Sequence, residues 1–402
     1  MRSAVALALA LAGGLAVTTA ACAVDAGAAL DGDAGPLDAA PLPPLAGATH
    51  DLTAADVTVL MPLPAPGVDA LWPADLAARG GVLLPRAVVD ELAAPSALAA
   101  AYDALRVIAV RFDPCFLSNW GTATCQPQVR LVLQPVDVAA GRAVDAAVHA
   151  LYNLEPAELP ALAQALRALT AAAPEQAAST RPLGVSPALA AQGVSGVYGQ
   201  HLRALVTAVA GEANLARVTF VAPAAETSTG GWVFGGRAVR AFPGVGFGPP
   251  GPLVIRALGL DVTAQAVAPA PGAPFAYEVA PMIAAPDGAP AVSAPALAAL
   301  SAGERAETYA WALRQESPRH VTADSTDCAS CHLAGRARGF LEATYPDLVE
   351  PATIATRPPR EPGAADQAGN LRALGYVDDA PAVSLRVAAE TRDVLAAFAD
   401  VR

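Results

Sequence analysis

Two cysteines and a histidine stand close together in the stretch STDCASCHLAGRARG (325–339). Cys328 and Cys331 are three residues apart, and His332 follows the second cysteine directly. On a helix, this spacing places both sulfur atoms on one turn with the imidazole beside them. Such a group could attach a haem covalently, hold a zinc ion or close a redox-active disulfide.

The pattern Cys-x-x-Cys-His resembles the haem-attachment motif of the c-type cytochromes. In that family, the two thiols add to the two vinyl groups of haem, and the histidine ligates the iron from the proximal side. By this resemblance, Cys328 and Cys331 carry the thioether bonds, His332 is the proximal ligand, and the cofactor is haem c. Residues 301–402 then form a short cytochrome c-like region, mostly helical or irregular.

The second axial ligand departs from the pattern of the small c-type cytochromes, which supply a distal methionine after the motif. Residues 333–402 contain neither methionine nor histidine. The ligand therefore comes from upstream, or the iron is five-coordinate. His320 is the nearest candidate and Met282 the alternative, with His149 and His201 further away. A bis-histidine iron would have a lower potential than a His/Met iron.

Zinc is the first alternative cofactor, because His320, Cys328, Cys331 and His332 provide the four ligands of a closed tetrahedral site. The adjacent Cys331 and His332 would both have to reach one ion. The second alternative is a disulfide, although the βαβ setting of thioredoxin-like redox sites is not evident. Either alternative describes a structural or binding lipoprotein rather than an electron carrier.

Three arginines flank the motif, Arg319, Arg336 and Arg338. Their guanidinium groups could pair with the propionates of a haem, since arginine binds carboxylates with two-pronged geometry. Solvated surface charges are the other interpretation.

The N-terminus, MRSAVALALALAGGLAVTTAAC, has one arginine, an apolar run and small residues before Cys22. This pattern is typical of a secretory signal over residues 1–21. The ending TTAAC resembles a bacterial lipobox, which implies a lipid anchor on Cys22. Residues 22–55 then form a flexible tether, rich in Ala, Asp, Gly and Pro. Export to the periplasmic face of the outer membrane or to the cell surface is expected.

Cys115 and Cys125 bound the loop PCFLSNWGTATC between two alternating runs. In an oxidising compartment such a local pair is expected to form a disulfide. The run 106–113 has Ile108, Val110 and Phe112 on one of its faces, and the run 128–136 has Val129, Leu131 and Leu133 on one of its faces. Two such alternating runs joined by a loop predict a β-hairpin.

The remaining patterns predict an α+β fold, with a body of unknown role over residues 56–300. Helices are expected over 85–92, 95–105, 142–211 and 301–316, the last with a Ser301–Glu304 capping box and a stripe of Ala306, Tyr309, Ala310 and Leu313. Short strands are expected over 216–282. An irregular stretch over 346–381 precedes a closing amphipathic helix over 385–399.

Charge and motifs narrow the function further. The 402 residues carry a net charge of −12, and every basic residue is arginine, which argues against nucleic acid as a partner. A di-haem peroxidase would need a second Cys-x-x-Cys-His, and no hydrolase or zinc-protease signature is present. An electron carrier is therefore favoured over an enzyme, with a peroxidase-like activity of a five-coordinate haem as the enzymatic alternative. The sequence predicts an exported monohaem electron carrier with a redox partner in the cell envelope.

Overall fold

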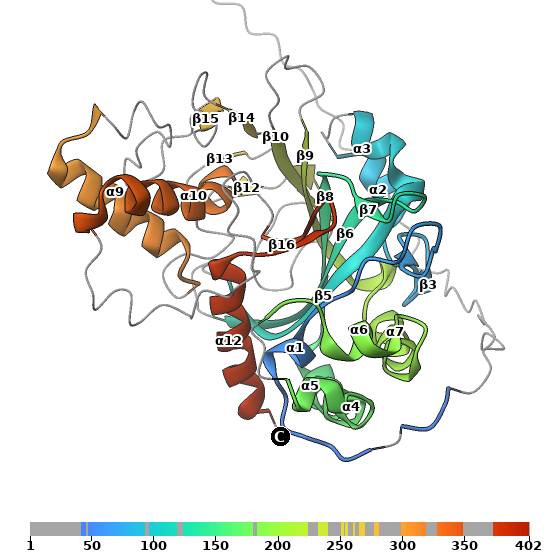
Figure 1. Ribbon diagram of the computed structural model, residues 1–402. Coiled ribbons are helices and arrows are strands. Elements are labelled where there is room, and N and C mark those ends of the chain that lie inside the picture. The colour runs from blue at the N-terminus through green and yellow to red at the C-terminus, as the bar shows by residue number, and fades with distance from the viewer. Residues whose placement is uncertain are drawn as a thin grey trace, which may run out of the picture. The chain divides into compact units, whose positions relative to one another are not determined.

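A long hairpin lies at the centre of the fold (Figure 1). Strands β5 (Leu105–Ser118) and β6 (Thr124–Asp137) pair antiparallel, with Val110 opposite Leu131. Alternating apolar side chains on these strands are buried on one face, because successive side chains of a strand point to opposite sides. The predicted hairpin is therefore confirmed.

The computed structural model describes residues 42–45, 47–92, 96–118, 124–179, 183–223, 232–239, 251–252, 254–255, 260–261, 265–269, 277–280, 299–318, 328–348 and 373–401. Within it, Pro43–Arg402 forms one compact unit. The described residues mix helices with antiparallel sheets, so the α+β class is confirmed. The expected signal and the lipid-anchored Cys22 lie outside these residues.

The main sheet has eleven strands among the described residues, and all its pairings are antiparallel. Its principal order is β1-β5-β6-β8-β9-β10-β14-β15, and β2, β7 and β11 pair at its sides. The further strands of this sheet are β1 (Thr58–Leu60), β2 (Trp72–Pro73), β7 (Arg142–Ala143), β8 (Ala147–Asn153), β9 (Leu215–Pro223), β10 (Trp232–Ala238), β11 (Gly251–Pro252), β14 (Gln265–Pro269) and β15 (Tyr277–Ala280). The predicted change to β structure after residue 216 is confirmed.

Small separate hairpins complete the strands. They are β3 (Ala77–Ala78) with β4 (Gly81–Val82), β12 (Val254–Ile255) with β13 (Leu260–Asp261), and β16 (Leu374–Val377) with β17 (Ala380–Val383). Strand β16 and the start of β17 lie in the stretch 346–381 that was expected to be irregular, so that expectation is wrong there. Asp378 makes the turn with φ 54°, a left-handed conformation that Asp tolerates.

The predicted helix over 142–154 is also wrong. Residues 147–153 form β8, which lies between β6 and β9 in the sheet. Alanine and leucine favour a helix in isolation, but pairing on both sides and burial of Val148, Ala150 and Tyr152 outweigh that preference.

The helices of the first part of the chain agree with the other predictions. Pro85 precedes α2 and Pro187 opens α6, where a missing N–H costs nothing. Buried leucines of α4 and α7 join the main core cluster. The helices are α1 (Ala54–Val57), α2 (Arg86–Asp90), α3 (Ser96–Ala100), α4 (Leu159–Leu169), α5 (Pro174–Ala177), α6 (Pro187–Gln192) and α7 (Val197–Val209).

Three longer helices follow residue 300: α9 (Ala302–Gln315), α10 (Cys328–Thr344) and α12 (Leu385–Ala399). The predicted capping box of α9 is present, since Ser301 Oγ accepts from the Glu304 N–H. The predicted apolar stripe is only partly right, because Ala306 is exposed. The buried residues of α9 are Thr308, Tyr309, Trp311, Ala312 and Gln315.

The closing helix α12 buries Val387, Thr391, Val394 and Phe398, in agreement with the prediction. It packs on the sheet at β5 and on α1. Strand β16 packs on the same region, where a Cβ atom at Gly375 would lie 2.4 Å from Gln134 Oε1. Only glycine allows this close approach of β16 to the sheet.

Candidate functional site

The Cys-x-x-Cys-His motif occupies the start of α10. The helix begins at Cys328, so Cys328, Cys331 and His332 lie at positions i, i+3 and i+4 on one side of it. Both thiols and the imidazole are partly buried. Cys328 packs against the main core, to which the neighbouring Leu333 also belongs. The predicted arrangement of the three side chains on one turn is therefore present.

His332 lies against the sheet. Its ring contacts Phe234 of β10, with the two ring centroids 5.0 Å apart and the planes tilted by 43°. Phe234 is almost fully buried. The contact fixes the motif next to β10, and α10 also packs on β14.

The strand register shows which other side chains share that face. Thr58, Arg111 and Arg130 are consecutive partners across β1, β5 and β6. The row continues through Leu151 of β8 to Arg217 of β9. Paired residues of adjacent strands point to the same side of a sheet, so three arginines form one row across it.

We call this side the polar face, defined by Arg111, Arg130, Gln134, His149 and Arg217. Phe234 belongs to it as well, because it pairs with Val221, which lies four residues along β9 from Arg217. The opposite face carries apolar residues such as Val110, Leu131, Tyr152 and Phe220. The motif thus faces the side of the sheet that carries the row of three arginines.

Helix α12 supplies the acid that meets these arginines. Glu390 accepts from Arg111 Nη1 and from Arg386 Nε, the latter at 2.9 Å, and lies 3.8 Å from Arg130 Nη1. Arg111 also donates to the Thr391 hydroxyl and the Val387 carbonyl, both at 2.9 Å. The network fastens α12 to the polar face (Figure 1).

The electrostatics of the cluster follow from this burial. Burial alone would raise the pKa of Glu390, but Arg111, Arg386 and Arg130 outweigh it and lower the pKa to about 2. Asp113 lies 3.4 Å from Arg130, yet desolvation raises its pKa despite that charge. Glu390 is therefore the firmly ionised acid of the cluster.

Arginine side chains also lie near the Cys-x-x-Cys-His motif. Burial would lower the pKa of Arg386, but Cys331, Glu390 and Glu316 nearby raise it overall. Arg130 and Arg217 lie over the ring of Phe116, with the guanidinium carbons 4.7 and 5.4 Å from its centroid. Arginines thus extend from Cys331 across the polar face.

Arg338 has neither of the two roles considered for it, a partner of haem propionates or a solvated surface charge. Its side chain is fully buried and donates to Glu316 at 2.7 Å and to Glu342 at 3.1 Å. It joins α9 to α10 and is not directed to a ligand, so pairing with propionates and a solvated surface position are both wrong for it. The side chains of Arg319 and Arg336 lie outside the described residues.

The other residues considered as iron ligands lie in different parts of the chain. His320 and Met282 lie outside the described residues. His201 is on α7, and its Nε2 lies 2.5 Å from the Pro43 carbonyl oxygen. His149 is on β8, not on a helix, and belongs to the polar face with Arg130. Where the chain is described, no three His, Cys, Asp or Glu side chains surround a common metal position.

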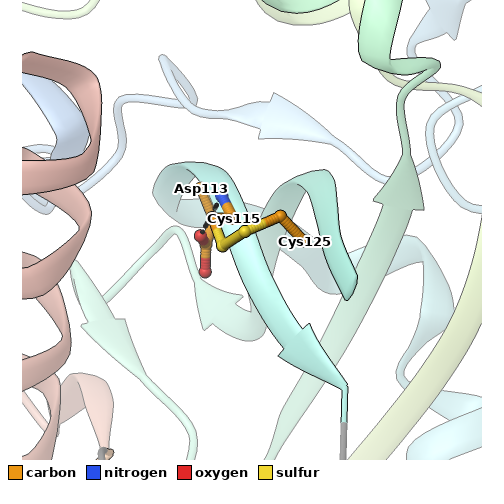
Figure 2. Close-up of a disulfide and its surroundings, with 3 residues drawn as sticks. All are labelled: Asp113, Cys115 and Cys125. Atoms are coloured by element: carbon orange, nitrogen blue, oxygen red, sulfur yellow. Dashed lines mark hydrogen bonds between the residues drawn. A yellow bond between two sulfur atoms is a disulfide. The ribbon is translucent and has the colours of Figure 1, made fainter. Parts of the chain in front are cut away.

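The predicted disulfide is present at the end of the central hairpin. Cys115 and Cys125 are joined with Cα atoms 4.3 Å apart, and the Cys115 N–H donates to Asp113 Oδ1 at 3.1 Å (Figure 2). A β-bulge between Asp113 and Phe116 lies at this point. The bridge closes the tip of the strands that carry the first two arginines of the row.

These residues fit a covalently bound haem. Two thiols and an imidazole share one helical turn, and the neighbouring face is rich in guanidinium groups that could receive propionates. Arg130 Nε is buried and, among the residues that the structure describes, has no hydrogen-bond partner. The arginine row was missed from sequence because its members lie on separate strands.

Comparisons with protein-family models, with curated proteins and with solved structures found no match. The described helices include none that is both long and apolar enough to span a bilayer.

Proposed function

We propose that the protein is an exported, lipid-anchored monohaem protein of the c-type cytochrome kind that transfers single electrons in the cell envelope. The observation that carries the proposal is the position of Cys328, Cys331 and His332 on the first turn of α10, facing the arginine-lined side of the sheet. Bound haem would supply the redox chemistry through its Fe(II)/Fe(III) couple.

The residues of the chain would have distinct tasks. Cys328 and Cys331 would hold the haem covalently, each through a thioether bond formed by adding its S–H across one vinyl group. His332 would ligate the iron, and its packing on Phe234 holds the imidazole in place. Arg386, Arg130 and Arg217 provide positive charge for the propionates.

Export and anchoring are part of the same proposal. The lipobox-like end of the signal supports a lipid anchor on Cys22 and a place at the outer membrane or cell surface. The Cys115–Cys125 disulfide is a bond typical of an oxidising compartment, where c-type haem is also attached. The partner would be a redox protein of the envelope, with no nucleic acid involved.

The test is to express the mature chain in a host that matures c-type cytochromes and to record a pyridine haemochrome spectrum after acid–acetone extraction. A c-type band that survives extraction, and is lost in Cys328→Ala/Cys331→Ala, supports the proposal. The matched control is Cys115→Ser/Cys125→Ser, which keeps the motif and should keep the band.

Other outcomes would reject the proposal. A chain without the band but with one zinc by elemental analysis has a structural metal site. A chain with neither band nor metal is a structural or binding lipoprotein with a disulfide near its C-terminus.

A further inference from the structure

The register of the sheet brings one histidine to the face on which His332 lies. His149 of β8 pairs with Thr219 of β9, and Thr219 pairs with Gly236 of β10. Phe234, the residue under the His332 ring, lies two positions from Gly236 on the same side of β10. His149 and His332 therefore approach one patch of the polar face from the sheet and from α10.

The residues between them are small. Thr219, Gly236 and Val221 separate His149 from Phe234 on this face, and Gly236 contributes no side chain. Glycine within a central strand often marks a place where a ligand or another backbone comes close. The positions on the sheet between His149 and Phe234 thus carry no large side chain.

The strand spacing sets the separation of the two histidine positions. Neighbouring strands are about 4.8 Å apart, so His149 lies roughly 10 Å across the sheet from Gly236, and Phe234 lies about 7 Å further along the strand. His332 stands above Phe234 at a centroid distance of 5.0 Å. Two imidazoles on one metal need their nitrogens about 4 Å apart, at bonds of about 2 Å, so the His149 side chain would have to lean along the sheet towards α10 to share a metal with His332.

The other described histidines and the buried methionine do not share this patch. His201 lies on α7 and contacts the Pro43 carbonyl. His50 lies beside Asp56, 4.0 Å away. Met61 is fully buried just after β1. Among the residues that the structure describes, His149 is thus the histidine or methionine placed for this role.

We propose that His149 is the second axial ligand of the iron, opposite His332; this inference rests on the haem proposed above. The row of Arg130, Leu151 and Arg217 adjoins His149 on one side, so the propionate edge would lie towards these arginines. The iron would then be six-coordinate and low-spin with two imidazole ligands.

The test uses the mature holoprotein and two spectroscopic readouts, electron paramagnetic resonance and the visible spectrum, besides a redox titration. Wild type should be low-spin. His149→Ala should keep its covalent haem by pyridine haemochrome and become high-spin, and added imidazole should restore the low-spin spectrum. His149→Met should stay low-spin with a raised potential, because methionine ligation favours Fe(II).

His201→Ala is the matched control and should leave spectrum and potential unchanged. A wild-type protein that is high-spin, or a His149→Ala protein that stays low-spin with covalent haem, would overturn the assignment of His149 while leaving the proposed function in place. A wild-type protein without covalent haem would instead reject the proposed function.

Discussion

Arg111 and Glu390 are 279 positions apart in the sequence and form a buried ion pair between β5 and α12. Glu390 also forms an ion pair with Arg386 and lies near Arg130, so one carboxylate balances several guanidinium groups. A buried acid in this position stabilises the fold mainly because its removal would leave those cations unbalanced.

Replacing this acid should therefore be costly. Glu390→Gln is expected to lower the free energy of unfolding by about 3–5 kcal/mol, the usual effect of breaking a buried pair. Urea unfolding followed by circular dichroism measures it. Asp103→Asn breaks the Arg86 pair, in which Asp103 is 83% exposed, and should cost at most about 1 kcal/mol. Equal losses in the two variants would contradict the central position given to Glu390.

Lowering the pH should remove the stabilisation that Glu390 provides. The pKa of Glu390 is lowered to about 2 in the folded protein, below its ordinary value of 4.5, so the acid stabilises the fold above pH 4.5. This stability is lost as the pH falls from about 4.5 towards 2. The difference in unfolding free energy between wild type and Glu390→Gln should shrink over that window. A difference that stays constant down to pH 2 would show that the charge of Glu390 is not responsible.

The disulfide at the hairpin tip should contribute measurably. Cys115 and Cys125 are 10 residues apart, and closing such a loop stabilises a fold by about 2–3 kcal/mol in the chain-entropy model. Reductant should lower the urea midpoint of the wild-type protein. Cys115→Ser/Cys125→Ser should start at the lower midpoint and respond little to reductant. An equal shift of the urea midpoint in both proteins would show that reductant does not act through the Cys115–Cys125 disulfide.

Arg338 should be essential to the joint between α9 and α10. Arg338→Met leaves Glu316 and Glu342 partly buried without their cation and should cost roughly 3–5 kcal/mol, measured by urea unfolding. Arg314→Met on the exposed side of α9 is the control and should change stability by less than about 0.5 kcal/mol. Similar values for both would argue against a structural role for Arg338.

Local patterns predicted much of the fold. The hairpin, the helices at 302–315 and 385–399 and the late strands follow from alternation, capping and helical periodicity. β8 was mistaken for a helix because alanine is common in every element of this chain, and only its pairing with β6 and β9 decides its conformation.

The site was predictable only in part. The spacing of Cys328, Cys331 and His332 is local, so the sequence shows it directly. The row of Arg111, Arg130 and Arg217 depends on strand order and register, including a bulge in β5. A hint was present in the central hairpin, where arginines occupy polar positions of strands whose other side is strongly apolar.

The late position of Glu390 has a consequence for the order in which the chain is made. Arg111 and Arg130 emerge long before Glu390, so until α12 docks this pair across β5 and β6 has Asp113 beside it but lacks its second acid. Folding can therefore be completed only when nearly the whole chain has been produced. A fragment that ends before residue 385 would leave Arg111 without the carboxylate that it meets in the complete chain.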